Sequence, residues 1–349
     1  MKLIIQIPCL NEEQTLPATL ADLPRDLPGF SEIEWLVIDD GSTDRTVEVA
    51  KANGVDHIVR LTTNKGLAYA FQAGLDASLK LGADVIVNTD ADNQYHGHDI
   101  GKLTAPIVAG EADMVVGDRE VMGIEHFSPL KKSLQRLGSW VVRRASNTTV
   151  PDTTSGFRSY NREAAMQLIV VSKFTYTLET IIQAGKQFIT VGHVPIRTNE
   201  KTRESRLFPS MWSYVRRNGL SIFRIYTRYE PLRVFMSAAI VVLLAAAIIW
   251  ARFFYFYVFE DDGAGHVQSL ILGAVLFNAG MLLAALGILG DLLSANSTML
   301  QRVFERVRRI ELEMEIPPSH YEPGQGSDVP PTTGARAGQR TEDHEALEV

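Results

Sequence analysis

The stretch VIVNTDADNQ (residues 85–94) decides how this sequence is interpreted. A short run of β-branched residues ends in Asp90 and Asp92, and Gln94 follows them. Residues i and i+2 of a strand point to the same side, so both carboxylates can reach one cation where the strand gives way to a loop. Hard divalent cations such as Mg²⁺ take oxygen ligands, often carboxylates together with substrate phosphates. A capped or solvated strand end is the alternative, since aspartate is common in turns.

The residues around this stretch alternate strands with helices. Strands are predicted at 3–7, 34–38, 57–61, 84–89 and 113–117, and helices at 11–20, 42–52, 67–81 and 99–108. This alternation is typical of an α/β fold with a mostly parallel sheet and helices on both faces. Such sheets bind ligands at the carboxyl ends of their strands. Polar residues gather at those ends, at 8–12, 39–40, 64–66, 90–94 and 117–119.

Beyond residue 119 the pattern is less regular. Cations are frequent between 131 and 144, with apolar residues at helical spacing, which suits either a surface-lying membrane helix or a solvated one. A short strand near 158–160 and a helix at 162–170 follow the segment 152–158. Two late strands are expected at 188–191 and 194–197, separated by Gly192 and His193.

Composition argues against several classes of protein. The chain has 349 residues and a formal net charge of −7, which does not suit a general nucleic-acid-binding protein. Cys9 is the single cysteine, so no intramolecular disulfide is expected and a reducing compartment is the simple interpretation. The sequence contains neither a G-x-G-x-x-G after the first strand nor a G-x-x-x-x-G-K-[ST], the fingerprints of dinucleotide-binding and P-loop proteins.

Two apolar stretches are long enough to cross a bilayer. Residues 234–251 and 267–290 contain no charged side chain, and a spanning helix needs about 20 apolar residues. Two buried core helices are the alternative, but neither stretch shows an amphipathic face. Aromatic and basic residues between 209 and 228 are typical of a helix at the membrane interface. The turn at 260–266 is acidic and arginines lie on the other flanks, so the positive-inside rule puts both termini in the cytoplasm.

The carboxylates at neighbouring strand ends suit a nucleoside diphosphate bound through a metal ion. The metal would link Asp92, together with Gln94, to the diphosphate and neutralise the charge that builds on it as a leaving group. Asp39 and Asp40 would accept hydrogen bonds from the base or the ribose.

A series of motifs resembles glycosyltransferase family 2, and most closely the polyprenyl-phosphate hexosyltransferases similar to dolichyl-phosphate mannose synthase. The motifs are IPCLNEE (7–13), VIDDGSTDRT (37–46), NKGLAYAFQAG (64–74), DADNQY (90–95), VVGDR (115–119) and DTTSGFRSY (152–160). The resemblance covers about residues 1–206. It implies a GT-A fold, a Rossmann-like mostly parallel sheet, and a metal-dependent, inverting glycosyltransferase.

The resemblance also implies roles for individual residues. Those expected to bind the nucleotide sugar are Pro8, Asn11, Glu12, Asp39, Asp40, Lys65, Asp90, Ala91 and Asp92. Asp90, Asp92 and Gln94 would hold Mg²⁺ or Mn²⁺, and Asp90, Asp92, Arg119 and Arg158 would be catalytic. The acceptor phosphate would meet Arg119, Lys131, Arg136, Arg158, Arg203 and Ser205, although Glu204 and Arg206 depart from the residues usual in the family.

The predicted reaction is a single in-line displacement at the anomeric carbon of a nucleotide sugar by an oxygen of a polyprenyl or dolichyl phosphate. GDP-mannose is the favoured donor, and UDP-glucose or another UDP-hexose is the alternative. A glycan or protein acceptor and a catalytically silent scaffold are the other hypotheses. A processive polysaccharide synthase is disfavoured because its Q/R-x-x-R-W motif is absent. Asp152 is expected to cap a turn rather than to act as a base.

The predicted organisation has five parts. They are a GT-A catalytic domain (1–206), an amphipathic interfacial helix (207–230), a two-helix transmembrane hairpin (231–292, with spans at about 234–258 and 267–290), a cytoplasmic helix (293–316) and a disordered tail (317–349). The protein is expected in the cell membrane, with its catalytic domain in the cytoplasm. An apolar stripe from Leu300 to Met314 suits self-association as a homo-oligomer or packing against the body equally well.

Overall fold

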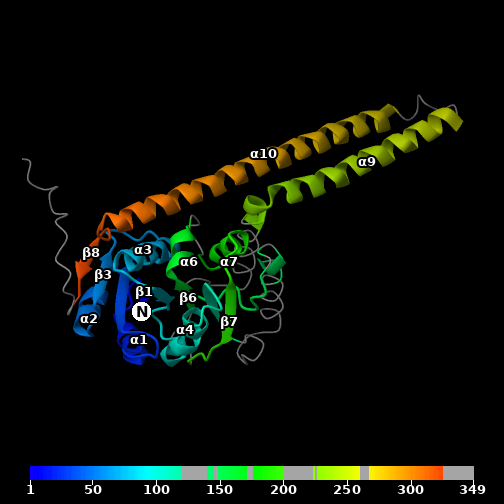
Figure 1. The fold of residues 1–349 in the computed structure, drawn as a ribbon. Coiled ribbons are helices and arrows are strands. Elements are labelled where there is room, and N and C mark those ends of the chain that lie inside the picture. The colour runs from blue at the N-terminus through cyan, green and yellow to red at the C-terminus, as the bar shows by residue number, and fades with distance from the viewer. Residues whose placement is uncertain are drawn as a thin grey trace, which may run out of the picture. The chain divides into compact units, whose positions relative to one another are not determined.

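The computed structural model describes residues 1–119, 140, 142–144, 146, 148–170, 176–199, 223–224, 226–259 and 267–324 (Figure 1). Contacts divide the chain into two compact units. We call them the sheet unit (residues 1–127, 148–204 and 308–349) and the hairpin unit (residues 128–147 and 205–307). Each unit is described by itself.

The sheet unit is built on one mixed sheet of eight strands in the order β7-β5-β6-β4-β1-β2-β3-β8. The strands are β1 (Lys2–Cys9), β2 (Glu32–Asp39), β3 (His57–Arg60), β4 (Val85–Asn88), β5 (Met114–Asp118), β6 (Arg158–Asn161), β7 (Val191–Pro195) and β8 (Tyr321–Pro323). The central strands β1, β2, β3 and β4 run parallel. β6 lies antiparallel between β4 and β5, so the GT-A-like sheet predicted from the sequence is confirmed.

Helices cover both faces of the sheet. One face carries α1 (Leu16–Asp22), α2 (Thr46–Ala52) and α4 (Ile100–Val108), the last preceded by the 3₁₀ turn η1 (Gly97–Asp99); the other carries α3 (Leu67–Lys80), α6 (Arg162–Gln167) and α7 (Tyr176–Lys186) (Figure 1). β1 is therefore buried from Leu3 to Cys9. A strand covered on both faces reads as a continuous apolar run rather than an alternating one.

Two predictions about the late strands and the tail are corrected. Gly192 and His193 do not separate two strands but lie inside β7, opposite Val115 and Val116 of β5. The tail predicted from residue 317 begins with the ordered strand β8, which extends the sheet antiparallel to β3. Its Tyr321 is buried, and the Tyr321 hydroxyl lies 2.9 Å from His57 Nδ1. The strand has only three residues and lies among prolines, so the sequence pattern did not predict it.

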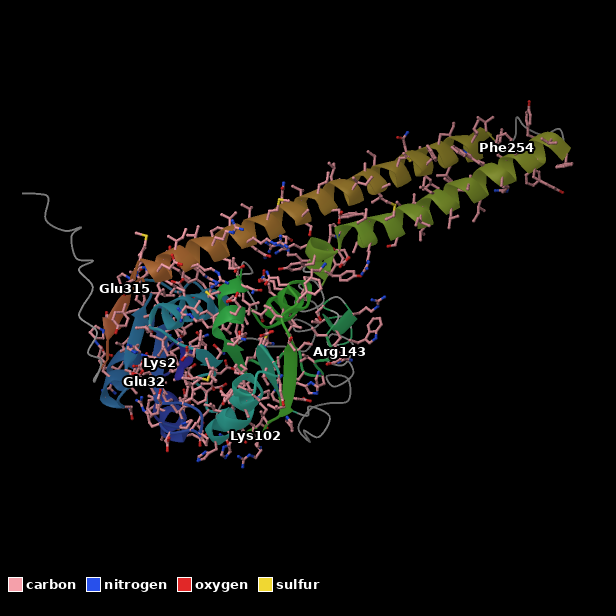
Figure 2. All side chains as sticks on the ribbon, viewed as in Figure 1. Lys2, Glu32, Lys102, Arg143, Phe254 and Glu315 are labelled. Carbon is pink, nitrogen blue, oxygen red and sulfur yellow. The ribbon has the colours of Figure 1, made fainter. Side chains whose placement is uncertain are left out.

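The hairpin unit contains the long apolar helix α9 (Pro231–Phe259) and most of α10 (Val267–Glu313), whose last residues from Arg308 belong to the sheet unit. Both are long and apolar enough to cross a membrane. Most of their apolar side chains are exposed, among them Val241 at 67 % and Leu282 at 64 %. Figure 2 draws these side chains along both helices and labels Phe254 on α9. Buried core helices would hide these side chains, so the alternative of two soluble core helices is not supported. α10 is continuous, so the second span and the helix predicted at 293–316 form one element.

The two helices of the hairpin meet through small residues at heptad spacing. Gly273, Gly280 and Gly287 are the buried residues of α10, and Ala239, Ala246 and Phe253 lie buried on α9. A Cβ at Gly273 would lie 2.2 Å from Trp250 Nε1, and one at Gly280 would lie 2.6 Å from Leu243 Cγ. Small residues at such a seam let two helix backbones approach closely.

Candidate active site at the carboxyl edge of the sheet

The predicted ligand-binding edge forms where β1, β2 and β4 end side by side. Asp39 is the last residue of β2 and pairs with Cys9 of β1, while Asn88 of β4 pairs with Gln6. The loops that follow these strands carry the acidic residues, so the fold brings together groups that are distant in the sequence. The β1–α1 loop is tied to the β2–α2 loop, because the backbone N–H of Asn11 donates to Ser42 Oγ at 2.9 Å.

Asn11 and Glu12 have local partners at this edge. The amide oxygen of Asn11 accepts a hydrogen bond from the backbone of Thr43 at 2.8 Å, and the backbone of Glu12 donates to Thr46 Oγ1 at 2.9 Å. Asn11 adopts a positive φ of 55°, a conformation that asparagine tolerates better than most residues. Both residues therefore shape the loop that follows β1, a strand in which Pro8 and Cys9 are still buried.

Asp39 and Asp40 are both buried but differ in what they bind. Asp40 accepts the backbone N–H groups of Lys65 and Gly66 at 2.7 and 2.9 Å, and burial raises its pKa. Asp39 accepts from Ser42 N through Oδ1, whereas its buried Oδ2 makes no hydrogen bond among the described residues and lies 3.8 Å from Arg60 Nε, an ion-pair distance. Asp40 thus positions the loop that carries Lys65, and Asp39 keeps an oxygen able to accept a donor from a ligand.

The conformation of Gly41, between Asp40 and Ser42, requires the glycine of the motif VIDDGSTDRT (37–46). Its φ is +75°, and a Cβ there would lie 2.7 Å from the backbone nitrogen of Asn64. Only glycine adopts this conformation without strain while allowing so close a backbone approach. The two strand-end loops can consequently pack together at the predicted nucleotide pocket.

Asp90 and Asp92 lie in the loop after β4, as predicted. Asp90 keeps part of its surface accessible, yet its carboxyl group lies deep enough that burial raises its pKa to about 7. The negative charges of Asp92 and Glu12 add to this effect, and Arg119 and Arg158 act against it. Oxygen ligands that repel one another in this way fit a hard divalent cation, which would relieve the repulsion.

The loop around Asp92 and Gln94 is fixed by its neighbours. Gln94 N donates to Asp92 Oδ1 at 3.2 Å, and Thr19 Oγ1 donates to the carbonyl of Ala91 at 2.9 Å. Asn199 N donates to the Gln94 carbonyl at 2.9 Å. Hydrogen bonds therefore fix the backbone that carries Asp92 and Gln94, as a preorganised metal site requires.

Arg119 follows β5 and forms a two-point ion pair with Asp152. Its Nε and Nη2 donate to the two carboxylate oxygens at 2.7 and 3.1 Å, and Nη2 also donates to Thr154 Oγ1 at 2.8 Å. Burial acts to raise the pKa of Asp152, but the charge of Arg119 outweighs this and holds the pKa below its usual value. Asp152 also accepts from Thr154 N at 3.2 Å. This carboxylate is a weak base and a turn cap, as expected.

Arg158 is fully buried, which corrects its predicted contact with the acceptor phosphate. Its exposed fraction is 0 %, and its N–H groups donate to the carbonyls of Ser155, Thr177 and Thr153 and to Thr180 Oγ1. The guanidinium joins the loop before β6 to helix α7. Because these donors are directed at protein oxygens, Arg158 presents no exposed surface to an acceptor phosphate.

Four residues that sequence reasoning missed support Asp90. A Cβ at Gly156 would lie 3.2 Å from both Asp90 carboxylate oxygens. Asn88 Nδ2 donates to the Gly156 carbonyl at 2.9 Å and to the Tyr176 hydroxyl at 3.0 Å, and the Tyr95 hydroxyl accepts from Gly156 N at 3.0 Å. Asn88 had a signal in the sequence, because an amide inside an apolar strand needs a buried partner.

The remaining predicted acceptor residues, Lys131, Arg136, Arg203 and Ser205, lie outside the described residues. So do most of the predicted interfacial helix and the acidic turn at 260–266. Lys65, by contrast, is described: its ammonium group lies 4.5 Å from the centre of the Tyr69 ring.

Comparisons with known proteins show which family the sequence is similar to. The model for glycosyl transferase family 2 matches residues 4–169. Undecaprenyl-phosphate mannosyltransferase of Micrococcus luteus is 31 % identical, over 47 % of this chain and 68 % of that protein. UDP-N-acetylglucosamine–dolichyl-phosphate N-acetylglucosaminyltransferase of Methanococcus voltae is 29 % identical, over 55 % of this chain and 83 % of that protein.

The fold also matches that of a solved glycosyltransferase. Glucosyl-3-phosphoglycerate synthase of Mycobacterium tuberculosis, in complex with Mn²⁺, UDP and glucosyl-3-phosphoglycerate, aligns with a TM-score of 0.50 at 20 % identity, over 63 % of this chain and 79 % of that one. At this identity the likeness concerns the fold. The class follows from the family model and the sequence relatives: this chain belongs to glycosyl transferase family 2.

Proposed function

We propose that this protein is a membrane-bound, inverting glycosyltransferase that moves a hexose from a nucleotide sugar to a polyprenyl or dolichyl phosphate. One observation carries the proposal. Asp90 and Asp92 follow β4 at the carboxyl edge of the sheet, in the same chain as two exposed apolar helices. The first feature suits a metal-bound nucleoside diphosphate, and the second suits an acceptor that resides in a bilayer.

The donor would bind across the ends of β1, β2 and β4. Asp39 Oδ2, which makes no hydrogen bond among the described residues, would accept an N–H of the base, while the loop held by Asp40 would bring Lys65 to the nucleotide. Asp90, Asp92 and Gln94 would hold Mg²⁺ or Mn²⁺. Such an ion supplies charge neutralisation for the diphosphate that leaves with the nucleoside.

The chemical step would be one displacement with inversion. A phosphate oxygen of the acceptor forms a bond to the anomeric carbon, and the bond from that carbon to the diphosphate oxygen breaks. A phosphate monoester has its second pKa near 6, so it is largely dianionic at neutral pH and needs no strong base. The lowered pKa of Asp152 is consistent with this scheme, because that carboxylate is a poor proton acceptor.

On the acceptor side, Arg119 is the described cation best placed to meet the phosphate. Its side chain is 18 % exposed and is oriented by Asp152 and Thr154. Arg158 would act indirectly, by holding the loop that contains Gly156 against Asp90. Contacts from Lys131, Arg136, Arg203 and Ser205 remain part of the proposal.

The membrane arrangement follows from charge. Arg224, Arg228 and Arg233 precede or open the first span, and Arg302 and Arg306 follow the second. The positive-inside rule then puts both flanks of the hairpin, and with them the sheet unit, in the cytoplasm. Self-association through residues 300–314 stays a prediction.

GDP-mannose is our favoured donor, on the motif resemblance and on the name of the Micrococcus relative. A UDP-hexose is the second candidate, since another relative is named for a UDP-sugar.

The purified protein with Mg²⁺ or Mn²⁺ should be given polyprenyl phosphate and a panel of labelled nucleotide sugars. We expect label in the organic phase with GDP-mannose. Label only in a water-soluble or protein fraction would contradict a lipid acceptor and support a glycan or protein acceptor.

A further inference from the structure

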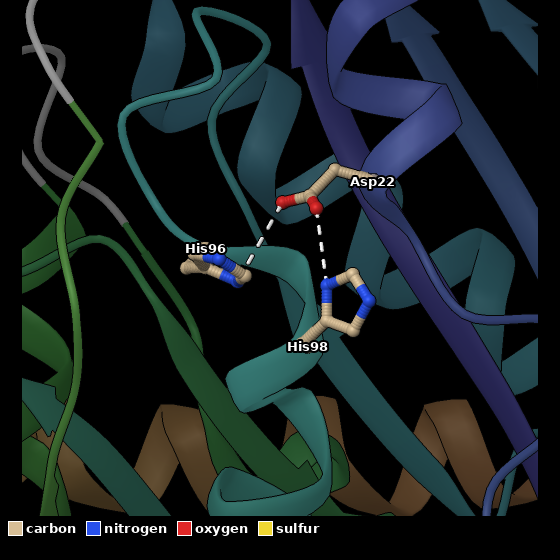
Figure 3. A group of neighbouring side chains, drawn as sticks. All are labelled: Asp22, His96 and His98. Atoms are coloured by element: carbon tan, nitrogen blue, oxygen red, sulfur yellow. Dashed lines mark hydrogen bonds and ion pairs between the residues drawn. The ribbon is translucent and has the colours of Figure 1, made fainter.

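A second group of potential metal ligands lies beyond the D-x-D motif. The sequence His96-Gly97-His98 follows Tyr95 and leads into η1, and it packs against Asp22, the last residue of α1. Figure 3 shows the Asp22 carboxylate between the two imidazole rings. His98 Nδ1 lies 3.1 Å from Asp22 Oδ1, and His96 Nδ1 lies 4.0 Å from Asp22 Oδ2.

Gly97 is what allows this close approach. Its backbone N–H donates to Asp22 Oδ2 at 2.5 Å, and a Cβ at this position would lie 2.3 Å from the Asp22 carbonyl oxygen. A residue with a side chain would push the loop away from the end of α1. The glycine therefore sets a histidine on either side of one carboxylate, which a looser loop would not do.

The environment of His96 is not that of an ordinary hydrogen-bonded histidine. Its Nδ1 is buried and has no hydrogen-bond partner among the described residues. At 4.0 Å from Asp22 Oδ2 it is beyond hydrogen-bonding distance. Buried polar atoms are nearly always partnered, so an exception of this kind is a signal of an ion or another ligand. The contact between His98 and Asp22 alone would carry no such signal.

The distances suit one small cation. The three ligand atoms, one from each residue, all lie within 4.8 Å of one another. A tetrahedral ion with bonds of about 2.0 Å places neighbouring ligands about 3.3 Å apart, so modest rotation of the two imidazoles completes the arrangement. The side chain of His98 is 71 % exposed against 20 % for Asp22, which leaves one side open for water as a further ligand.

We propose that Asp22, His96 and His98 form a binding site for a borderline divalent cation of the Zn²⁺ class, separate in chemistry from the D-x-D site. Two imidazoles and one carboxylate are ligands that Zn²⁺, Co²⁺ and Ni²⁺ prefer, whereas Mg²⁺ prefers oxygen alone. Asp99, the nearest further carboxylate in the sequence, is engaged by Arg197 and Lys102, each at 2.9 Å.

Occupancy of this site would stiffen the loop that holds the predicted donor residues. The cation would join α1 to the residues directly after Gln94 and Tyr95. Tyr95 stacks on Phe157, with ring centres 5.0 Å apart, and accepts a hydrogen bond from Gly156. Zn²⁺ is therefore expected to raise the melting temperature of the protein, independently of any sugar donor.

The test uses the full-length protein without a histidine tag, in detergent, with millimolar Mg²⁺ present to occupy oxygen-only sites. Co²⁺ is titrated while visible absorption is recorded, and Zn²⁺ is then added as a competitor. We expect one Co²⁺ per chain, a visible band typical of low coordination with nitrogen ligands, and displacement by Zn²⁺. His98→Ala and Asp22→Asn should each weaken binding at least tenfold.

His193→Ala is the matched control, because His193 is exposed on β7 away from this group. It should bind as the unmodified protein does. The proposal is overturned if His98→Ala binds Co²⁺ and Zn²⁺ unchanged, or if excess Mg²⁺ abolishes binding, which would assign the ion to the D-x-D residues. Melting temperatures without metal show whether each variant is folded, and His98→Gln replaces His98→Ala if that variant is not.

Discussion

The carboxyl edge of the sheet has an acidic half, with Glu12, Asp90 and Asp92, and a basic half, with Arg119 and Arg158. The two halves differ in whether neighbouring groups of the protein neutralise these charges. After β1 and β4, the charges of Glu12, Asp90 and Asp92 oppose one another, and the pKa of Asp90 rises to about 7. Beside β5 and β6, Arg119 is paired with Asp152 and Arg158 is surrounded by oxygen acceptors. A buried charge that the protein itself compensates is structural, whereas a set that repels is prepared for a ligand of opposite charge.

Replacing Asp92 should have the largest effect. If the carboxylates after β1 and β4 bind a cation, Asp92→Ala removes one of its ligands together with the hydrogen bond from Gln94 N, and transfer should fall by at least ~100-fold. The measurement is hexose transfer at saturating donor, together with calorimetric titration of Mn²⁺. The matched control is Asp26→Ala, an exposed aspartate in the α1–β2 connection at the opposite edge of the sheet. Wild-type activity in Asp92→Ala would contradict the claim that the acidic half binds a cation needed for transfer.

Replacing Arg158 tests whether the charges of the basic half serve the stability of the fold. Arg158→Ala leaves several buried carbonyl oxygens without a donor, so the free energy of unfolding of the sheet unit should fall by about 3 kcal/mol. Denaturant titration measures this, with the exposed Arg45→Ala as a control expected to change little. A direct phosphate ligand would behave otherwise: its loss would raise the acceptor KM while leaving stability intact.

Arg119 should give an intermediate result, because it is paired but still partly exposed. Arg119→Lys keeps the charge and loses the two-point contact with Asp152. We expect kcat/KM for the lipid phosphate to fall about tenfold, with the donor KM unchanged. Steady-state kinetics with each substrate varied in turn separates the two. A rise in donor KM alone would indicate that Arg119 contacts the nucleotide sugar and not the lipid phosphate.

The smallest effect concerns Glu34 in β2, a compensated carboxylate far from the site. Burial acts to raise its pKa, but hydrogen bonds from His57 and Lys2 outweigh this and lower it to about 2. A lowered pKa stabilises the fold above about pH 4.5, and this contribution is lost as pH falls toward 2. Glu34→Gln should cost about 1 kcal/mol at pH 7 and nothing near pH 2. Equal losses at both pH values would show that charge is not the cause.

The sequence predicted the parts of the fold that repeat a local pattern. The βαβ alternation located β1 to β5 and the edge at which Asp39 and Asp90 lie, and uncharged length located α9 and α10. β8 was missed because its three residues are ordered by pairing with β3, a contact made across most of the chain. Gly192 was expected to interrupt a strand, but pairing with β5 overrode that local preference.

The site was predicted in outline but not in its internal bonding. Motifs identified which residues gather, yet they did not distinguish Asp39, whose Oδ2 makes no hydrogen bond among the described residues, from Asp40, whose two oxygens both accept backbone N–H groups. Nor did they reveal that Arg158 faces inward, since the segment DTTSGFR (152–158) is the same sequence whether its arginine binds a ligand or donates to backbone carbonyls. Side-chain direction in irregular segments depends on tertiary packing, which a local pattern does not encode.

The most direct test of the central claim is the mass spectrum of the lipid product. The full-length protein is incubated with GDP-mannose, Mn²⁺ and a polyprenyl phosphate of defined length, and the organic phase is analysed. The account predicts a new species equal to the polyprenyl phosphate plus one hexosyl residue, absent with Asp92→Ala and present with Asp26→Ala. An unchanged lipid with every nucleotide hexose tried, in a protein shown to be folded and to bind Mn²⁺, would contradict it.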